Sequence, residues 1–196
     1  RDGVGVEMNQ AKAIDLYKKS AEQNHPYSQY SLANYYYEGK DIKQNYVKAV
    51  ELYGKSAEQG LDEAQYSLGV CYSQGQGVEQ SYAEAMEWFL KADAQGNANA
   101  QNELGKCYYY AYGVEQDYVQ AVNYFRKAAE QGHSEAQNYI GNCYYEGKGV
   151  EQSFELAAEW HAKSAEQGEI GALNDLALSY YLGEGVEQNY EKAIEL

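Results

Sequence analysis

The sequence predicts an all-α solenoid of 36-residue helix-turn-helix repeats, and three columns of matching residues carry this prediction. A Gln-Gly pair recurs every 36 residues, with its glycines at Gly60, Gly96, Gly132 and Gly168. A second column holds Val78, Val114, Val150 and Val186, with Val6 and Ile42 as upstream equivalents. A third column holds Asn9, Asn45, Ser81, Asp117, Ser153 and Asn189. Repeats of this kind stack only on their neighbours, so we expect an extended binding surface rather than one pocket.

The first helix of the reference repeat, helix A, is predicted over residues 46–58. Asn45 precedes it, and the short polar side chains of this column are the preferred N-cap residues. Gly60 is predicted to end the helix, because this position favours a positive φ. Apolar or small residues at the spacing of one helical face lie between them, at Tyr46, Ala49, Val50, Tyr53 and Ala57.

The second helix, helix B, is predicted over residues 62–74. Leu68 and Gly69 belong to its inner face, and the small residue permits close contact with a neighbouring helix. Gly75 and Gly77 then turn the chain towards the next N-cap. A helix pair of this size cannot bury both faces alone, so each pair needs a neighbour on either side.

We expect residues 1–196 to form a single solenoid domain of five helix A/helix B pairs and a truncated sixth helix A. The chain opens without Met and closes at Leu196 inside a helical pattern, which predicts a segment of a longer chain. Tyr190, Ala193 and Ile194 should leave an uncovered apolar side, because terminal repeats normally carry a polar cap. End-to-end self-association is therefore expected.

The charge balance limits the classes of partner. The formal net charge is -15, from 15 basic and 30 acidic residues, whereas nucleic-acid binders need clustered Lys and Arg. No apolar run approaches the length of a membrane helix. We expect no nucleic acid and no membrane within this segment. A basic protein or peptide suits such a surface, and the alternative is that the charge serves only solubility.

The three cysteines share one column of the repeat, at Cys71, Cys107 and Cys143. Neighbouring helices pack about 8–10 Å apart, whereas a disulfide needs Cα atoms within about 7 Å. We therefore expect unpaired thiols, which favour a reducing compartment. The compartment itself is not fixed by the sequence.

The sequence offers no catalytic constellation. His161 takes the place of Phe89 and Phe125 inside helix A, so we interpret it as a core histidine. Cys143 lies in the adjacent element, but no third residue is present to orient a Cys-His pair. No spacing of His, Cys or carboxylates matches a metal site. We expect no enzymatic activity, no cofactor and no metal.

Several recurring elements resemble the Sel-one-like repeat (SLR) family, a relative of tetratricopeptide repeats. The elements are Trp88, Ala92, Gln95-Gly96, Ala100, Leu104-Gly105, Tyr108, Gly113-Val114, Asp117 and Ala121. The resemblance covers essentially the whole chain and implies a right-handed α/α superhelical solenoid. It also implies an adaptor or scaffold role and a concave side lined by helix A. Family members occur in bacteria, including secreted and periplasmic ones, and in the eukaryotic endoplasmic reticulum.

The candidate protein-binding residues lie in columns that vary between repeats. Val47, Leu90 and Val119 are apolar where the helix A periodicity predicts exposure, and Arg126 shares the column of Leu90. Such positions can receive a helix or an extended peptide on the concave face. The alternative is that they contact the neighbouring repeat.

Tyrosines on helix B form a second candidate set. Tyr109 and Tyr145 occupy one column together with Tyr37 and Tyr181, whereas Ser73 interrupts the series. Tyrosine is enriched at binding hot spots, and it also packs well between repeats, so both interpretations stay open.

The predicted function is a non-catalytic protein-protein interaction scaffold or adaptor. Its partner is a protein or peptide on the concave face. The alternative is the repeat domain of a larger enzyme or secreted effector whose active part lies outside this segment.

Overall fold

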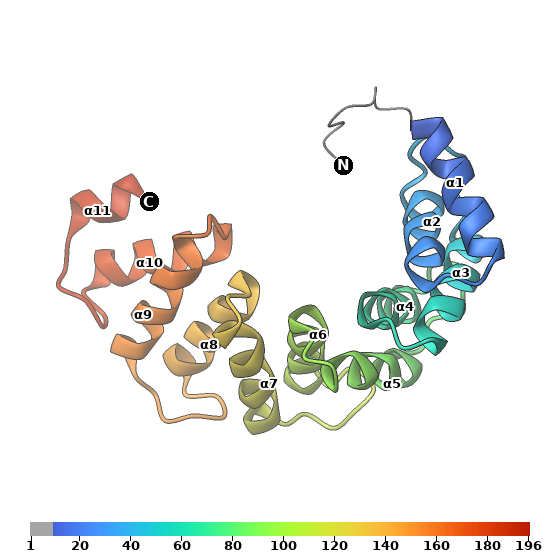
Figure 1. Ribbon diagram of the computed structural model, residues 1–196. Helices are drawn as coiled ribbons and strands as arrows, with labels where there is room; N and C mark the ends of the chain where they lie inside the picture. Colours follow the sequence, from blue (N-terminus) through green and yellow to red (C-terminus); the bar gives the residue numbers. More distant parts are fainter. Residues whose placement is uncertain (1–9) are drawn as a thin grey trace. The chain divides into compact units, whose positions relative to one another are not determined.

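The computed structural model describes residues 10–196, and every regular element in that range is a helix (Figure 1). Val6 and Asn9, which the sequence assigns to the first repeat, lie outside the described residues. The predicted fold class, an all-α solenoid of helix-turn-helix repeats, is confirmed. In chain order the described helices are α1 (Gln10–Glu22), α2 (Pro26–Glu38), α3 (Tyr46–Glu58), α4 (Asp62–Gln74), α5 (Tyr82–Asp93), α6 (Ala98–Tyr110), α7 (Tyr118–Glu130), α8 (Ser134–Glu146), α9 (Phe154–Ala165), α10 (Ile170–Leu182) and α11 (Tyr190–Glu195).

The chain divides into two compact units. Unit 1 ends at Gln95 and contains α1 to α5, and unit 2 spans Gly96–Leu196 and contains α6 to α11. Within each unit, consecutive helices pack against each other in chain order. The same helix pair therefore recurs in both units, and equivalent positions can be compared directly.

The N-cap column starts the odd-numbered helices from α3 to α11 as predicted. Asn45 begins α3, and its side chain accepts a hydrogen bond from the backbone N–H of Lys48 at 3.0 Å. Gly60 follows the end of α3 with φ 92°, which only glycine adopts readily. The same side-chain cap recurs at Ser81, Asp117, Ser153 and Asn189.

The closest packing occurs across the Gly-x-Gly loop. In unit 1, α4 packs more extensively against α5 than against α3. A Cβ added to Gly69 on α4 would lie 2.5 Å from Cε1 of Phe89 on α5, so only glycine fits there. The same contact recurs in unit 2 between Gly105 and Phe125, and between Gly141 and His161. These glycines let an aromatic ring of the following helix lie directly on the backbone.

Candidate protein-binding surfaces

Three of the predicted binding residues are exposed apolar side chains. Val47 on α3 is 65% exposed, Leu90 on α5 is 42% exposed, and Val119 on α7 is 55% exposed. Val47 and Leu90 belong to unit 1, and Val119 belongs to unit 2. Side chains this accessible contribute little to the packing of the solenoid, so each is free to contact a partner.

Arg126 is half-buried on α7, in the same column as Leu90. Its Nη2 donates a hydrogen bond to the hydroxyl of Tyr144 on α8 at 3.5 Å. The guanidinium is thus held beside the next helix of unit 2, with donors left over for a second acceptor.

A groove opens beside the odd-numbered helices of unit 1. It has a volume of about 330 Å³, and its apolar part comprises Leu32, Tyr36 and Leu52. Unit 2 has an equivalent groove of about 410 Å³ that contains Leu176, Tyr180 and Leu196. The column of Leu52 and Leu196 also holds Trp88 and Trp160, and Leu52, Trp88 and Trp160 pack against the cores of their units. The rim of the unit 1 groove is charged and consists of Lys18, Glu22, Lys48, Glu51 and Lys55.

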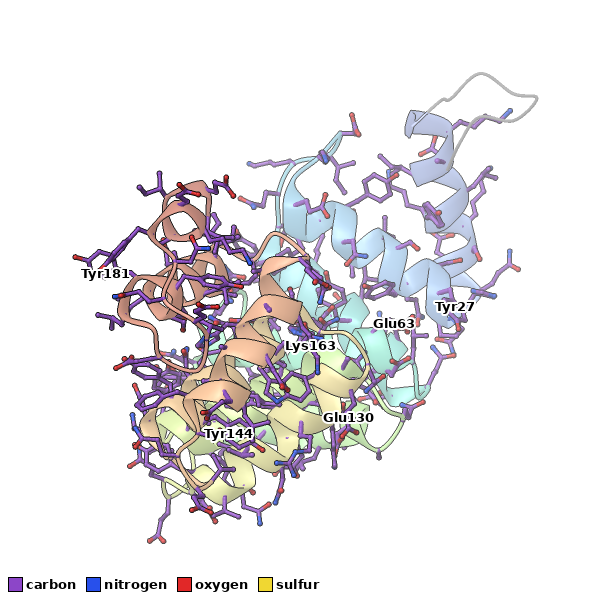
Figure 2. The ribbon with its side chains drawn as sticks, turned by 90° about the vertical axis from the view of Figure 1, so that its left-hand side faces the viewer. Tyr27, Glu63, Glu130, Tyr144, Lys163 and Tyr181 are labelled. Carbon is purple, nitrogen blue, oxygen red and sulfur yellow. The ribbon has the colours of Figure 1, made fainter. Side chains whose placement is uncertain are left out.

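The structure places Tyr109 and Tyr145 in contacts between repeats, which is the packing role that the sequence left open. Tyr109 is only 9% exposed, and its hydroxyl accepts a hydrogen bond from Lys148 Nζ at 3.1 Å. The Tyr145 hydroxyl donates to Glu184 Oε2 at 2.8 Å. Lys148 and Glu184 are the central residues of the following Gly-x-Gly loops, so each tyrosine fastens the next repeat. Tyr181, in the same column, is 56% exposed and points away from the ribbon (Figure 2).

A ladder of glutamine pairs escaped the sequence analysis. Gln59, which precedes Gly60, donates from Nε2 to Oε1 of Gln29 on α2 at 2.7 Å, and Gln29 is only 2% exposed. The Gln-Gly column therefore recurs because its glutamine satisfies a buried amide of the preceding repeat. The regular spacing was visible in the sequence, but the buried partner was not identified. The equivalent pairs are Gln95 with Gln65, Gln131 with Gln101, and Gln167 with Gln137.

A polar and aromatic cluster on α6 and α8 of unit 2 also escaped the sequence analysis. Lys106 Nζ lies 2.7 Å from Glu103 Oε1 and 2.9 Å from Glu135 Oε1. The hydroxyls of Tyr110 and Tyr139 lie 3.3 Å apart beside these charges. Neighbouring repeats lack this combination in the same columns, so the internal repetition gave no signal for it.

The three cysteines and His161 are buried in their uncharged forms. Cys71, Cys107 and Cys143 are free and buried, and burial raises the pKa of each thiol to about 12. His161 is 1% exposed, and burial lowers its pKa to about 4. A protonated thiol is a poor nucleophile. The Nε2 of His161 lies 3.0 Å from Asn142 Oδ1. Because its pKa is about 4, His161 is a neutral core residue at pH 7.

Two further features concern metals and membranes. Among residues 10–196, no group of three His, Cys, Asp or Glu side chains is arranged to hold a metal ion. None of the helices in the described part of the chain is both long enough and apolar enough to span a bilayer.

Comparison with known proteins identifies the family. The Sel1 repeat model matches residues 1–25, 26–61, 62–97, 98–133, 134–169 and 170–196. The chain belongs to the Sel1 repeat family. Sel1 repeat proteins are generally non-catalytic scaffolds that bind other proteins. No curated protein matches the chain significantly.

Solved structures support the same assignment. A protective antigen of uropathogenic Escherichia coli with an SLR fold is 38% identical, with a TM-score of 0.89 over 96% of this chain. The chain spans only 40% of the length of that antigen. A Sel1 repeat protein from Oxalobacter formigenes is 35% identical, with a TM-score of 0.91, and the match covers 97% of this chain and 76% of that one. An immunity protein from Pseudomonas aeruginosa is 25% identical, with a TM-score of 0.57 over 86% of this chain and 62% of that one.

The repeat of the family starts one helix later than the repeat predicted from the sequence. The matched repeats begin at residues 26, 62, 98, 134 and 170, so each complete repeat starts with an even-numbered helix. The close contact between Gly69 on α4 and Phe89 on α5 lies within one matched repeat, residues 62–97. Helix A of the family therefore corresponds to α2, α4, α6, α8 and α10. Val47, Leu90 and Val119 lie on the other helix of each repeat.

Proposed function

We propose that this Sel1 repeat chain is a non-catalytic scaffold that binds a partner protein or peptide. The observation that carries the proposal is the exposure of Val47, Leu90 and Val119, which are 65%, 42% and 55% accessible on a solenoid with a packed core. Exposed apolar side chains do not stabilise the fold unless a partner covers them.

Each unit has its own candidate contacts. In unit 1, Val47 and Leu90 lie on the odd-numbered helices, on which the groove above Leu52 also opens. In unit 2, Val119 and Arg126 lie on α7 and supply one apolar and one cationic contact. Because the family frame makes the even-numbered helices the first of each repeat, we propose these residues as a surface apart from the concave side. Tyr109 and Tyr145 support it by fixing the following loops.

The same scaffold is expected to associate end to end. Tyr190 and Ile194 on α11 are 55% and 85% exposed, which leaves an apolar side for a second copy. The acidic balance favours a basic partner and acts mainly on the association rate. Sedimentation at increasing protein concentration tests the first expectation, and the salt dependence of the association rate tests the second.

Quantitative affinity capture from a lysate of the source organism tests the main proposal. Leu90→Glu and Val119→Glu should each reduce recovery of a specific partner about tenfold or more, because each removes an apolar contact and introduces a charge. Both variants should keep the free energy of unfolding within about 0.5 kcal/mol, as is usual for exposed positions.

Ala83→Glu is the matched control. Ala83 shares the column of Val47 and Val119 and is exposed, so its substitution adds the same charge without removing a large apolar side chain. Recovery should be unchanged in this variant. Unchanged recovery in Leu90→Glu and Val119→Glu would contradict the proposed surface, and so would a large loss of stability.

A further inference from the structure

The cluster on α6 and α8 combines a tyrosine platform with a carboxylate pair on one face of unit 2. On α6, Glu103, Lys106 and Tyr110 lie three and four residues apart, which places them along one stripe of the helix. On α8, Glu135 and Tyr139 are four residues apart in the same way. The carboxylates lie nearer the starts of the two helices, and the tyrosines lie further along them.

The tyrosines form a supported and accessible platform. Tyr110 is 43% exposed, and its ring meets that of Tyr139 edge to face at 6.3 Å. Tyr139 stacks on Phe125 with a centroid distance of 4.6 Å, so its ring is held by the core. Tyr109 packs edge-on against Tyr110 at 4.8 Å. These contacts hold the Tyr110 ring in place while the residue stays 43% exposed.

The backbone at the end of α6 is unusual at the same place. Ala111 adopts φ 61°, the left-handed conformation for which the other repeats use glycine. A non-glycine residue in this region is disfavoured by about 1 kcal/mol. The residues on either side, Tyr110 and Tyr112, stack at 5.5 Å, so the strained turn holds two aromatic rings together.

The charges of the cluster do not balance. Glu103 and Glu135 share the single cation of Lys106, at 2.7 Å and 2.9 Å, which leaves a surplus of one negative charge. Asn102 lies beneath them at 1% exposure and donates from Nδ2 to Glu135 Oε2 at 2.8 Å. The Oδ1 of this amide has no hydrogen-bond partner, so an unused acceptor lies beside the carboxylates. Both carboxylates are also close enough to Tyr139 to contribute to raising the pKa of its hydroxyl, which burial raises most.

We propose that this face of unit 2 binds an arginine side chain of a basic peptide partner. The guanidinium stacks on Tyr110 and pairs with the Glu103–Glu135 carboxylates, beside Lys106. This proposal adds detail to the proposed scaffold function. It rests on that function because the arginine belongs to a bound peptide.

Arginine fits this surface better than other ligands. Its planar guanidinium can stack on an aromatic face while it donates to a carboxylate, whereas the compact lysine ammonium does this less well. The local surplus of one negative charge matches one cation. A nucleotide would also stack on tyrosine, but its phosphate would meet the net charge of -15.

Peptide binding to residues 1–196, followed by NMR titration, tests the proposal. The probes are the heptapeptide GSGRGSG and its counterparts with Lys or Gln at the central position, all at physiological salt. The arginine peptide should bind tightest and the glutamine peptide weakest. Tyr110→Ala should weaken arginine binding by about two- to fivefold, which is the expected loss of an exposed cation–π contact.

Glu135→Gln should produce a similar loss, because it removes the charge but keeps an acceptor for Asn102. Tyr181→Ala is the control, since Tyr181 is an exposed tyrosine elsewhere in unit 2 and should not affect binding. Equal binding of the arginine and glutamine peptides would overturn the proposal, because the charge would then not be recognised. Equal losses in Tyr110→Ala and Tyr181→Ala would also overturn it. Neither result depends on partner capture by Leu90 and Val119, so the two proposals fail separately.

Discussion

Units 1 and 2 stack their repeats with the same residues, but one column of the even-numbered helices holds a different residue type in each unit. Unit 1 has Tyr30 and Tyr66 in this column, and the Tyr30 ring lies 5.9 Å from that of Tyr53. Unit 2 has Asn102, Asn138 and Asn174, and Asn102 donates to Glu135 instead. In unit 1 the position adds aromatic packing, and in unit 2 it supports a polar surface. Stacking and recognition therefore depend on different columns of the same repeat.

The column of Tyr53 differs between one repeat of unit 1 and one of unit 2, whereas Phe89 and Phe125 occupy it in the repeats between them. In unit 1 the Tyr53 hydroxyl donates to Asn34 Oδ1 at 2.5 Å, and in unit 2 His161 Nε2 lies 3.0 Å from Asn142 Oδ1. The link between helices is retained, but only the histidine changes its charge between the unfolded and the folded chain in the mildly acidic range, because burial lowers its pKa from 6.5 to about 4. The two units should therefore respond alike to changes in stacking and differently to changes in pH.

The largest expected effect concerns a contact that both units share. Gly69→Ala in unit 1 and Gly105→Ala in unit 2 should each lower the free energy of unfolding by about 2–3 kcal/mol, because the added methyl overlaps the ring of Phe89 or Phe125. Urea unfolding followed by circular dichroism measures the change. Gly54→Ala is the control, since nothing lies within 4 Å of the added Cβ, and it should stabilise the helix by about 0.5–1 kcal/mol. A neutral result at both Gly69 and Gly105 would refute the close-packed joint.

The pH dependence of unit 2 separates it from unit 1. The pKa of His161 falls from 6.5 to about 4 on folding, because burial disfavours the charged ring. The unfolded chain therefore binds a proton more readily, and stability is complete above pH 6.5 and declines between pH 6.5 and 4. Between pH 7 and pH 5, the free energy of unfolding should fall by about 2 kcal/mol less in His161→Phe than in the unsubstituted protein. Denaturant unfolding at the two pH values checks this, and equal pH dependence in both proteins would contradict it.

The glutamine ladder should contribute equally to both units. Gln59→Ala and Gln131→Ala each remove the donor to a buried glutamine amide, Gln29 in unit 1 and Gln101 in unit 2. Each variant should lose about 1 kcal/mol, the usual effect of leaving a buried acceptor without a donor. Thermal unfolding of the two variants measures the loss. A difference of more than about 1 kcal/mol between them would show that the units do not share this device.

The smallest effect is expected at the strained turn of unit 2. Ala111→Gly restores the residue that the other repeats use at this left-handed position, where Ala111 has φ 61°. The variant should gain about 0.5 kcal/mol, since relief of strain is partly offset by the greater freedom of glycine in the unfolded chain. Precise denaturant midpoints detect a change of this size, and a loss of stability would indicate that Ala111 makes a favourable contact.

The sequence predicted local structure closely because its signals are local. Residues 46–58 and 62–74 were predicted as helices, and α3 and α4 have these bounds, since Asn45 and Gly60 fix the ends by short-range hydrogen bonding and backbone conformation. Interactions between repeats were harder to predict. The Tyr109 hydroxyl accepts a hydrogen bond from Lys148, which lies 39 residues further along the chain, and no local pattern encodes such a contact.

The candidate site was predictable only in part. The exposure of Val47, Leu90 and Val119 follows from helical periodicity alone. The cluster of Glu103, Glu135 and Tyr139 depends on which side chains of α6 and α8 meet, and this contact lies across about 30 residues of sequence. The frame of the family repeat, which places α4 and α5 in one repeat, came from the family match and not from the internal columns of the sequence.

Hydrogen-exchange mass spectrometry with the arginine heptapeptide tests most directly whether recognition is confined to one unit. The account predicts slower exchange in unit 2 over residues 103–112 and 135–142 when the peptide is bound. The equivalent segments of unit 1, residues 31–40 and 63–70, should exchange at the same rate with and without peptide. Equal protection in both units, or protection in unit 1 alone, would contradict the claim that the two units share their stacking but differ in recognition.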